Sequence, residues 1–143
     1  MSLAQTVKID SCVLVTTPQD IAVSEILKSI SLFRSLGIPV SGIISNMDHF
    51  RCRGCGSVTE IFPKGRLLMN QIVATTDDYD GDGNRNNVNI LGTVPILESL
   101  SRALDQGVPI SDENRTELEP LYNEIGKKFL DHVQKDQSNK ENG

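Results

Sequence analysis

The sequence predicts an α/β fold, a partial parallel sheet with flanking helices, on three observations. Short apolar runs rich in β-branched residues at 12–16, 40–45 and 89–94 are typical of strands covered on both faces. Segments with apolar residues at helical spacing alternate with these runs. The joints around the first helix are short, as in a right-handed parallel β–α–β unit. Because so few strands are visible, we expect the chain to form part of a larger sheet.

Three residues after the first strand predict the start of a helix. Thr17 supplies a capping hydroxyl, Pro18 suits the first helical position, and Asp20 places a carboxylate three residues after the cap. Gly37 predicts the end of this helix, and Pro39 prevents it from resuming. The apolar stripe expected to face the sheet consists of Val23, Ile26, Leu27, Ile30 and Phe33.

Two further helices are predicted in the middle of the chain, at residues 64–74 and 96–106. A polar insertion at residues 75–89 separates the first of these helices from the third strand. Gly107 predicts the end of the second. The apolar side of that second helix is expected to consist of Ile96, Leu97, Leu100 and Leu104.

The last predicted helix covers residues 113–133, where apolar residues recur at helical spacing. Pro120 falls inside this segment and predicts a break or kink near Glu119, because proline removes a backbone hydrogen bond from a helix. Residues 134–143 contain no apolar side chain and are predicted to be a disordered polar tail. The folded part is therefore expected to be residues 1–133.

Composition and charge argue against several classes of protein. A chain of 143 residues with 38% apolar content suffices for one domain, and no run approaches the roughly 20 apolar residues of a membrane span. The net charge of -5 argues against a general affinity for nucleic acid. Three cysteines do not make a disulfide framework, so an intracellular, reducing compartment is expected. Residues 1–5 match neither a signal peptide nor a mitochondrial presequence.

The pair Cys52 and Cys55 is the strongest candidate site, because two thiolates at this spacing can bind one metal centre. Arg51 and Arg53 flank the pair and are expected to favour the thiolate form. His49 is close enough in the sequence to serve as a further ligand, although an exposed histidine is the simpler interpretation.

The two cysteines alone supply too few ligands for a metal centre. A tetrahedral metal or a cubane cluster needs about four ligands in total, and the remaining cysteine, Cys12, lies in an apolar run that favours a place in the core. Either two copies of the chain share the site, or the site is vestigial, or the two thiols form a redox disulfide. Spacing alone does not separate zinc from an iron–sulfur cluster, since both take thiolates tetrahedrally.

A calcium loop is a weaker candidate. Asp78, Asp80 and Asp82 occupy the first, third and fifth positions of such a loop, and Gly83 occupies the sixth. The twelfth position requires a bidentate glutamate but holds Asn89. A flexible acidic loop is therefore the better interpretation.

Several segments, taken together, resemble the Mrp/ApbC family of P-loop ATPases, which act as scaffolds or carriers in iron–sulfur cluster assembly and are related to MinD. The resemblance covers approximately residues 2–111, and the ordered combination of motifs makes it specific. The segments are residues 13–20, 43–47, 50–56, 61–62, 91–96 and 106–110.

The resemblance implies roles for particular residues. Cys52 and Cys55 match the paired cysteines that join the same pair of a second subunit to hold a bridging 4Fe-4S cluster. Asn46 matches the position expected near the adenine base, and Pro95 and Ile96 match the stretch that lines the same pocket. The implied partners are a second copy of the chain and iron–sulfur client apoproteins. The family's mitochondrial branch, which serves respiratory complex I, suggests the mitochondrial matrix, and cytosolic relatives suggest the cytoplasm.

The chain also departs from the family pattern. It contains no Gly-x-x-x-x-Gly-Lys-[Ser/Thr] loop to hold phosphates. Residues 63–66, Pro-Lys-Gly-Arg, stand where the family tends to have a glycine-rich turn. The chain thus resembles the C-terminal portion of a P-loop domain without its N-terminal strands. We expect ATP and Mg²⁺ to bind the intact family member, and we expect this chain alone not to hydrolyse ATP.

The resulting prediction is an iron–sulfur cluster scaffold or carrier that binds a 4Fe-4S cluster between two subunits. Two alternatives stay open at this point. One is a non-enzymatic zinc-binding or interaction module, and the other is an inactive fragment.

Overall fold

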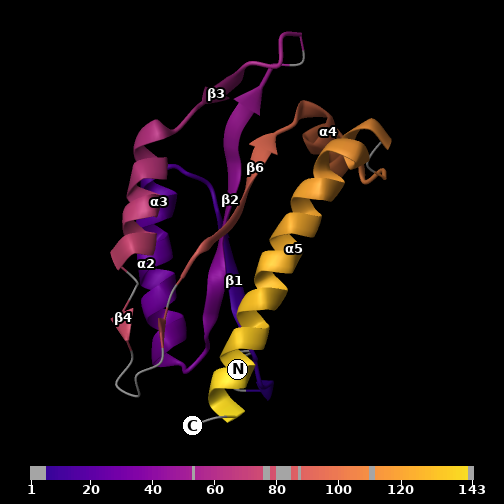
Figure 1. Cartoon of the computed structure of the whole chain (residues 1–143). Coiled ribbons are helices and arrows are strands. Elements are labelled where there is room, and N and C mark those ends of the chain that lie inside the picture. Colours follow the sequence, from indigo (N-terminus) through magenta and orange to yellow (C-terminus); the bar gives the residue numbers. More distant parts are fainter. Residues whose placement is uncertain are drawn as a thin grey trace.

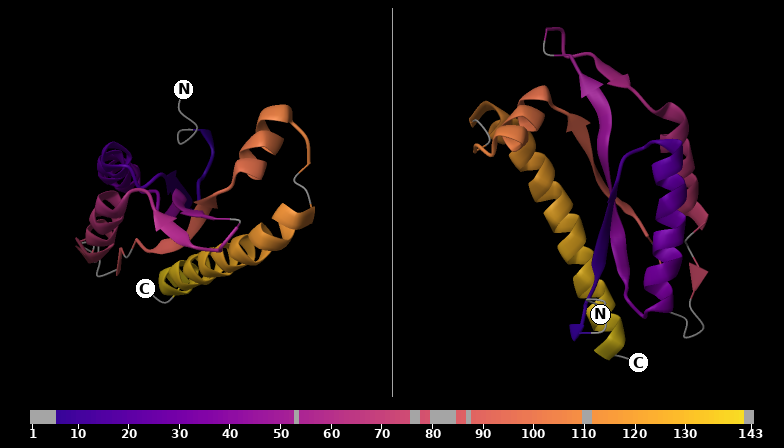
Figure 2. Two further views of the ribbon diagram at one scale, coloured as in Figure 1. Left: turned by 90° about the horizontal axis from the view of Figure 1, so that it is seen from above. Right: turned by 180° about the vertical axis from the view of Figure 1, so that it is seen from behind.

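The computed structural model describes most of the chain as a mixed sheet with helices on both faces (Figure 1). Helices α2 (Asp20–Ser35) and α3 (Pro63–Thr75) cover one face, and α5 (Asp112–Glu141) covers the other (Figure 2). The α/β class and the flanking helices are therefore confirmed. The described residues are 6–52, 54–75, 78–79, 85–86, 88–109 and 112–141.

Strand β2 (Val40–Arg51) is the centre of the sheet. Strands β1 (Cys12–Thr16) and β6 (Ile90–Ile96) run parallel to it and pair with the same part of β2, so they lie on opposite sides of it. Strand β3 (Val58–Glu60) runs antiparallel and pairs with the far end of β2. The parallel β1–α2–β2 unit predicted from the sequence is confirmed, and β3 makes the sheet mixed.

Each face of the sheet has its own buried core, because neighbouring strand residues point to opposite faces. Leu14 and Ile43 face α2 and α3, whereas Val13 and Ile44 face α5. The core beneath α2 and α3 is formed by Leu14, Val23, Ile26, Ile30, Ile43, Met69, Ile72 and Val88. The core beneath α5 is formed by Leu91, Val94 and Ile125, with Val13, Ile44, Leu121 and Phe129 packed around them.

The start of α2 differs from the prediction. The helix begins at Asp20 with Gln19 as its N-cap, so capping by Thr17 is wrong. Thr17 and Pro18 instead belong to the connection from β1, where Thr17 is half-buried and the buried Pro18 packs against the start of α3. Leu27 is also wrong as a core residue, since it is 46% exposed while the other members of the stripe pack on the core. Gly37, with φ 68°, follows the end of the helix as expected.

Two strands extend further than predicted. The sequence predicts that the second strand ends at residue 45, but β2 continues to Arg51 because β3 pairs with its far end. The third strand was expected to stop before Pro95, but β6 includes Pro95 and Ile96. The register of β2 and β6 passes directly from Asn46–Val94 to Phe50–Ile96. Pro95 therefore lies opposite a bulge in β2, a place where a strand tolerates proline.

Both helices predicted in the middle of the chain are present, but the second differs from its prediction in detail. Helix α3 matches the prediction to within one residue at each end. Helix α4 (Glu98–Gln106) begins two residues late, because Ile96 belongs to β6. Leu104 is 68% exposed and Ala103 is buried, so Leu104 was wrongly placed on the apolar side. Gly107 ends this helix in the left-handed conformation, as predicted.

Helix α5 contradicts two predictions. It continues through Pro120 without the expected break. Pro120 is exposed, and the residues after it, Leu121, Ile125 and Phe129, pack on the sheet and stabilise the helix. Instead of a disordered tail after Val133, the helix continues to Glu141, and residues 142–143 lie outside the described residues. Lys, Gln and Glu in this stretch are good helix formers, which extend a helix that packing has already nucleated.

The described part of the polar insertion contains a small antiparallel ladder. Strand β4 (Asp78–Tyr79) pairs with strand β5 (Arg85–Asn86). The remaining candidate calcium-loop residues, Asp80, Asp82 and Gly83, lie outside the described residues. Among the described helices, none combines the length and apolar composition needed to cross a membrane.

Candidate metal centre on the β2–β3 hairpin

Cys52 and Cys55 lie in the loop that joins β2 to β3, and this hairpin projects beyond the rest of the sheet (Figure 1). The ladder continues past the paired strands, because the Cys52 amide donates to the Ser57 carbonyl at 2.9 Å. The Gly56 amide closes the loop by donating to the Cys52 carbonyl at 2.8 Å. Both cysteines therefore sit in one short hydrogen-bonded turn at the tip of the hairpin.

The two thiols differ in their surroundings. Cys52 is half-buried and Cys55 is exposed, and both are free thiols in the described part of the chain. The Cys55 Sγ lies 3.1 Å from the Ser57 hydroxyl oxygen. Hydrogen bonds from the Ser57 side chain, the Ser57 backbone and the Cys52 side chain lower the pKa of Cys55. Burial in β1 has the opposite effect and raises the pKa of Cys12.

Among the described residues, hydrogen bonds, above all from Ser57, lower the pKa of Cys55. The expected effect of the flanking arginines stays a prediction. Arg53 lies outside the described residues. Cys55 is nevertheless the thiol that ionises more readily than an ordinary cysteine, as a metal ligand must.

Alkylation rates check this difference between the cysteines. A lower pKa gives a larger thiolate fraction at neutral pH, so we expect Cys55 to react with iodoacetamide faster than Cys12. Replacing Ser57→Ala removes the main cause, and the alkylation midpoint of Cys55 should move to higher pH. Mass spectrometry of each modified cysteine across a pH series measures both effects. An unchanged midpoint in the Ser57→Ala variant would contradict this explanation.

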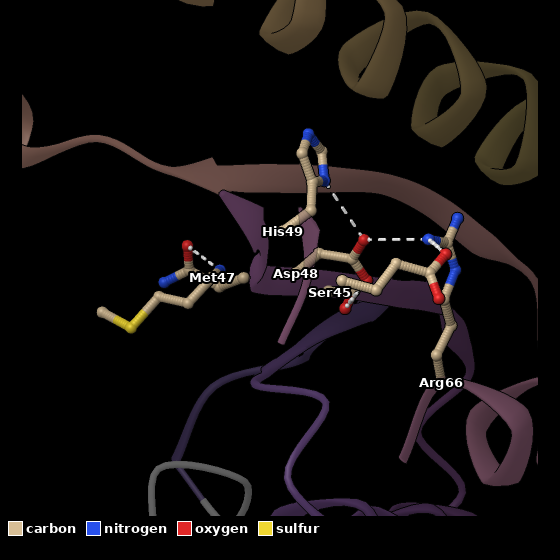
Figure 3. A network of polar contacts seen from close by, with 7 residues as sticks. Ser45, Met47, Asp48, His49 and Arg66 are labelled. Carbon is tan, nitrogen blue, oxygen red and sulfur yellow. Dashed lines mark hydrogen bonds and ion pairs between the residues drawn. The ribbon is translucent and has the colours of Figure 1, made fainter. Parts of the chain in front are cut away.

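One chain supplies an incomplete metal site. Within the residues that the structure describes, no group of three or more His, Cys, Asp or Glu side chains could hold a metal ion. His49 forms no such group with the thiols among the described residues, and its Nδ1 lies 3.3 Å from the Asp48 Oδ2 (Figure 3). Two soft thiolates fit zinc or an iron–sulfur cluster, and they provide half of the about four ligands that either requires.

The residues expected near a nucleotide do come together. Asn46 pairs with Val94, directly before Pro95 and Ile96, so all of them lie on adjacent strands. Asn46 is not at the end of its own strand as predicted, but Ser45 pairs with Thr16, the last residue of β1. Asn46 therefore still marks the carboxyl edge of the parallel part of the sheet, where α/β folds bind ligands. Its side-chain oxygen accepts a hydrogen bond from the Met47 amide at 3.0 Å.

One polar group next to this edge was not predicted from the sequence. Asp48 is buried in β2, and Arg66 of α3 reaches it from a neighbouring element (Figure 3). An acidic residue three positions after an apolar strand could have signalled the site. Its partner could not be found in this way, because Arg66 follows 18 positions later and local spacing does not connect the two.

The fold defines a class, the α/β proteins of P-loop type. A nucleotide-binding protein from Archaeoglobus fulgidus, solved in complex with ADP, matches 68% of this chain and 35% of its own chain. The TM-score is 0.52 and the sequence identity is 26%.

A family model described as ParA, NUBPL iron-transfer P-loop NTPase, matches residues 1–130, and the chain belongs to this family. This confirms the resemblance drawn from the motifs.

Two curated relatives carry names of the same kind. An "Iron-sulfur cluster carrier protein" from Aquifex aeolicus is 36% identical over 110 residues, which cover 77% of this chain and 27% of the relative. An "Iron-sulfur cluster transfer protein NUBPL" from Mus musculus is 34% identical over 110 residues, which cover 77% of this chain and 31% of the relative. The chain thus spans about a third or less of these relatives' length.

Proposed function

We propose that this chain supplies the cluster-binding part of an iron–sulfur cluster carrier, in which two subunits hold one 4Fe-4S cluster between their Cys52–Cys55 hairpins. The observation that carries the proposal is the pair of thiols at the tip of a projecting hairpin, which provides half of a four-ligand site. The names of the relatives support the chemistry, since they carry or transfer iron–sulfur clusters.

In this proposal the cluster is cargo, and the hairpin suits both its capture and its release. The exposed position of Cys55 allows a second subunit, and later a client apoprotein, to approach the metal. The hydrogen bonds from Ser57 lower the pKa of Cys55 and so increase its thiolate fraction. Because each subunit contributes only two ligands, separation of the subunits leaves the cluster half-coordinated, which favours its transfer to a client with more thiolates.

We propose nucleotide binding only for the intact family member. Asn46, Pro95 and Ile96 would line the adenine side of a pocket at the carboxyl edge of the sheet. A phosphate-binding loop would have to come from residues that this sequence lacks. We therefore infer that residues 1–133 act as the C-terminal portion of a P-loop domain. The chain alone is expected to leave ATP unhydrolysed.

The proposal also includes the client proteins and the cellular compartment. The resemblance to the mitochondrial branch, supported by the mouse NUBPL match, favours clients in respiratory complex I assembly within the mitochondrial matrix. The alternative is cluster delivery in the cytoplasm.

Anaerobic reconstitution with iron and sulfide tests the proposed function. We expect about one 4Fe-4S cluster per two chains, accompanied by a shift from monomer to dimer in size-exclusion chromatography. Tight zinc binding without a cluster would favour the zinc-binding module instead. Binding of neither would leave the inactive fragment as the explanation.

A further inference from the structure

The cysteine hairpin leaves the sheet at a bulge in β2. Met47 has a left-handed conformation, with φ 56°, which non-glycine residues seldom adopt. The pairing of β2 with β6 is interrupted over residues 47–49 and resumes at Phe50. Bulges bend a strand and redirect the residues that come after them. The bulge therefore sets the direction in which the hairpin and its two cysteines point.

A charged side chain is buried in this bulge. The Asp48 side chain is only 1% exposed, although an ionised carboxylate in the interior requires compensating partners. The Ser45 hydroxyl donates to its Oδ1 at 2.9 Å. The His49 Nδ1 lies 3.3 Å from its Oδ2, and an Arg66 guanidinium nitrogen lies 3.5 Å from the same oxygen (Figure 3).

Arg66 connects this carboxylate to the returning strand of the hairpin. The same guanidinium nitrogen lies 2.7 Å from the Glu60 Oε1, and Glu60 is the last residue of β3. Arg66 itself is part of α3, which packs on the core. One arginine thus joins the bulge, the hairpin and the rigid body of the domain. We refer to Ser45, Asp48, His49, Glu60 and Arg66 as the Asp48 network.

The hairpin depends on this connection because its packing is weak. All residues of β3 are exposed, including the apolar Val58. Phe50, on the last part of β2, is also exposed. A two-stranded hairpin without an apolar face packed on a core is marginally stable in its position. Apolar packing therefore cannot hold the thiols at one angle to the sheet.

We propose that Asp48 and Arg66 are positioning residues that hold the Cys52–Cys55 hairpin at a fixed angle to the sheet. This inference rests on the proposed function, since two hairpins must direct four sulfur atoms at one cluster. A metal site tolerates little misplacement of its ligands, so groups that orient the ligand-bearing segment affect how firmly the metal is held. The Asp48–Arg66 ion pair is only partly buried, because the Arg66 side chain is 42% exposed. Such a pair adds little net stability, so we assign to it the orientation of the hairpin.

Three variants separate positioning from general stability. Asp48→Asn keeps the shape of the side chain and its acceptor for Ser45 but removes the charge that faces Arg66. Glu60→Gln weakens the link to β3 at an exposed site, where an ion pair contributes little to folding. Glu98→Gln is the matched control, because Glu98 and Arg102 form an exposed ion pair of the same 2.7 Å length on α4, away from the hairpin.

The first measurement is the release of iron from the reconstituted cluster to a chelator. We expect release about tenfold faster or more in Asp48→Asn, and a smaller acceleration in Glu60→Gln. Glu98→Gln should match the unchanged protein. Equal release rates in Asp48→Asn and Glu98→Gln would overturn the positioning role.

The second measurement needs no cluster and so keeps the inference separate from the proposed function. NMR relaxation of the Cys52, Gly56 and Ser57 amides in the metal-free chain reports whether the hairpin is rigid relative to the sheet. We expect lower order parameters for these amides in Asp48→Asn, while amides of β1 and α2 stay unchanged. If the unchanged protein bound no cluster but this loss of order appeared, the proposed function would fail and the positioning role would stand. Unchanged hairpin order would overturn the positioning role itself.

Discussion

Replacing Cys55→Ala is expected to abolish cluster binding. If two subunits share one cluster, each chain contributes two of about four thiolates. The variant dimer would keep only two, and a single thiolate from each side cannot hold the cluster against water. Hydrogen bonds from Ser57 also lower the pKa of Cys55, so its loss removes a ligand that ionises readily. After anaerobic reconstitution, bound iron and sulfide should fall at least about tenfold.

Cys12→Ala is the control for this experiment. Cys12 pairs with Val40 at the beginning of β2, whereas Cys52 follows the end of that strand. A strand of 12 residues spans on the order of 30–40 Å, so Cys12 lies far from the hairpin. The Cys12→Ala variant should bind as much iron as the unchanged protein. A cluster that survives Cys55→Ala but is lost in Cys12→Ala would refute the hairpin as the site.

The second large effect is expected for Gly65→Ala, which should destabilise the domain. A Cβ atom built at Gly65 would overlap the Pro18 carbonyl oxygen, so the backbone of α3 and the β1–α2 connection must move apart. Pro18 is itself fully buried, which leaves little room for that movement. Forcing atoms into a packed interior costs about 1–3 kcal/mol and sometimes more. Urea unfolding followed by circular dichroism measures the loss.

Gly126→Ala provides the matched control on another helix. A Cβ at Gly126 of α5 meets no atom within 4 Å among the described residues. Alanine also favours the helix over glycine by up to about 1 kcal/mol. This variant should therefore be as stable as the unchanged protein or slightly more stable. If both glycine variants behaved alike, close packing at Gly65 would be disproved.

Gly65 also affects the position of Arg66. It stands at the second position of Lys64-Gly65-Arg66, where the start of α3 contacts Pro18. The absence of a side chain lets α3 approach the β1–α2 connection closely. That approach places the following residue, Arg66, within reach of both Asp48 and Glu60.

Local patterns in the sequence were sufficient for the features that depend on local chemistry. The β1–α2–β2 unit was found from apolar runs and helical spacing, and α3 was found to within one residue. The cysteine pair was found from its spacing alone. Each of these signals lies within a few residues, because backbone periodicity and a shared metal both act over short distances.

Contacts between distant segments decided the rest. Pairing with β3 extended β2 to Arg51, beyond residue 45, where the sequence predicted its end. Packing against the sheet carried α5 past Pro120, and the position of α4 buried Ala103 rather than Leu104.

By itself the sequence determined that this is an α/β chain of the NUBPL iron-transfer P-loop family with one pair of thiols in a turn. Only the tertiary structure decided that those thiols stand on a projecting hairpin held through Asp48, Arg66 and Glu60. The physical reason is the distance along the chain over which each effect acts. Backbone preference and residue spacing are properties of neighbouring residues, whereas the burial of a charge and its compensation depend on which elements the fold brings together.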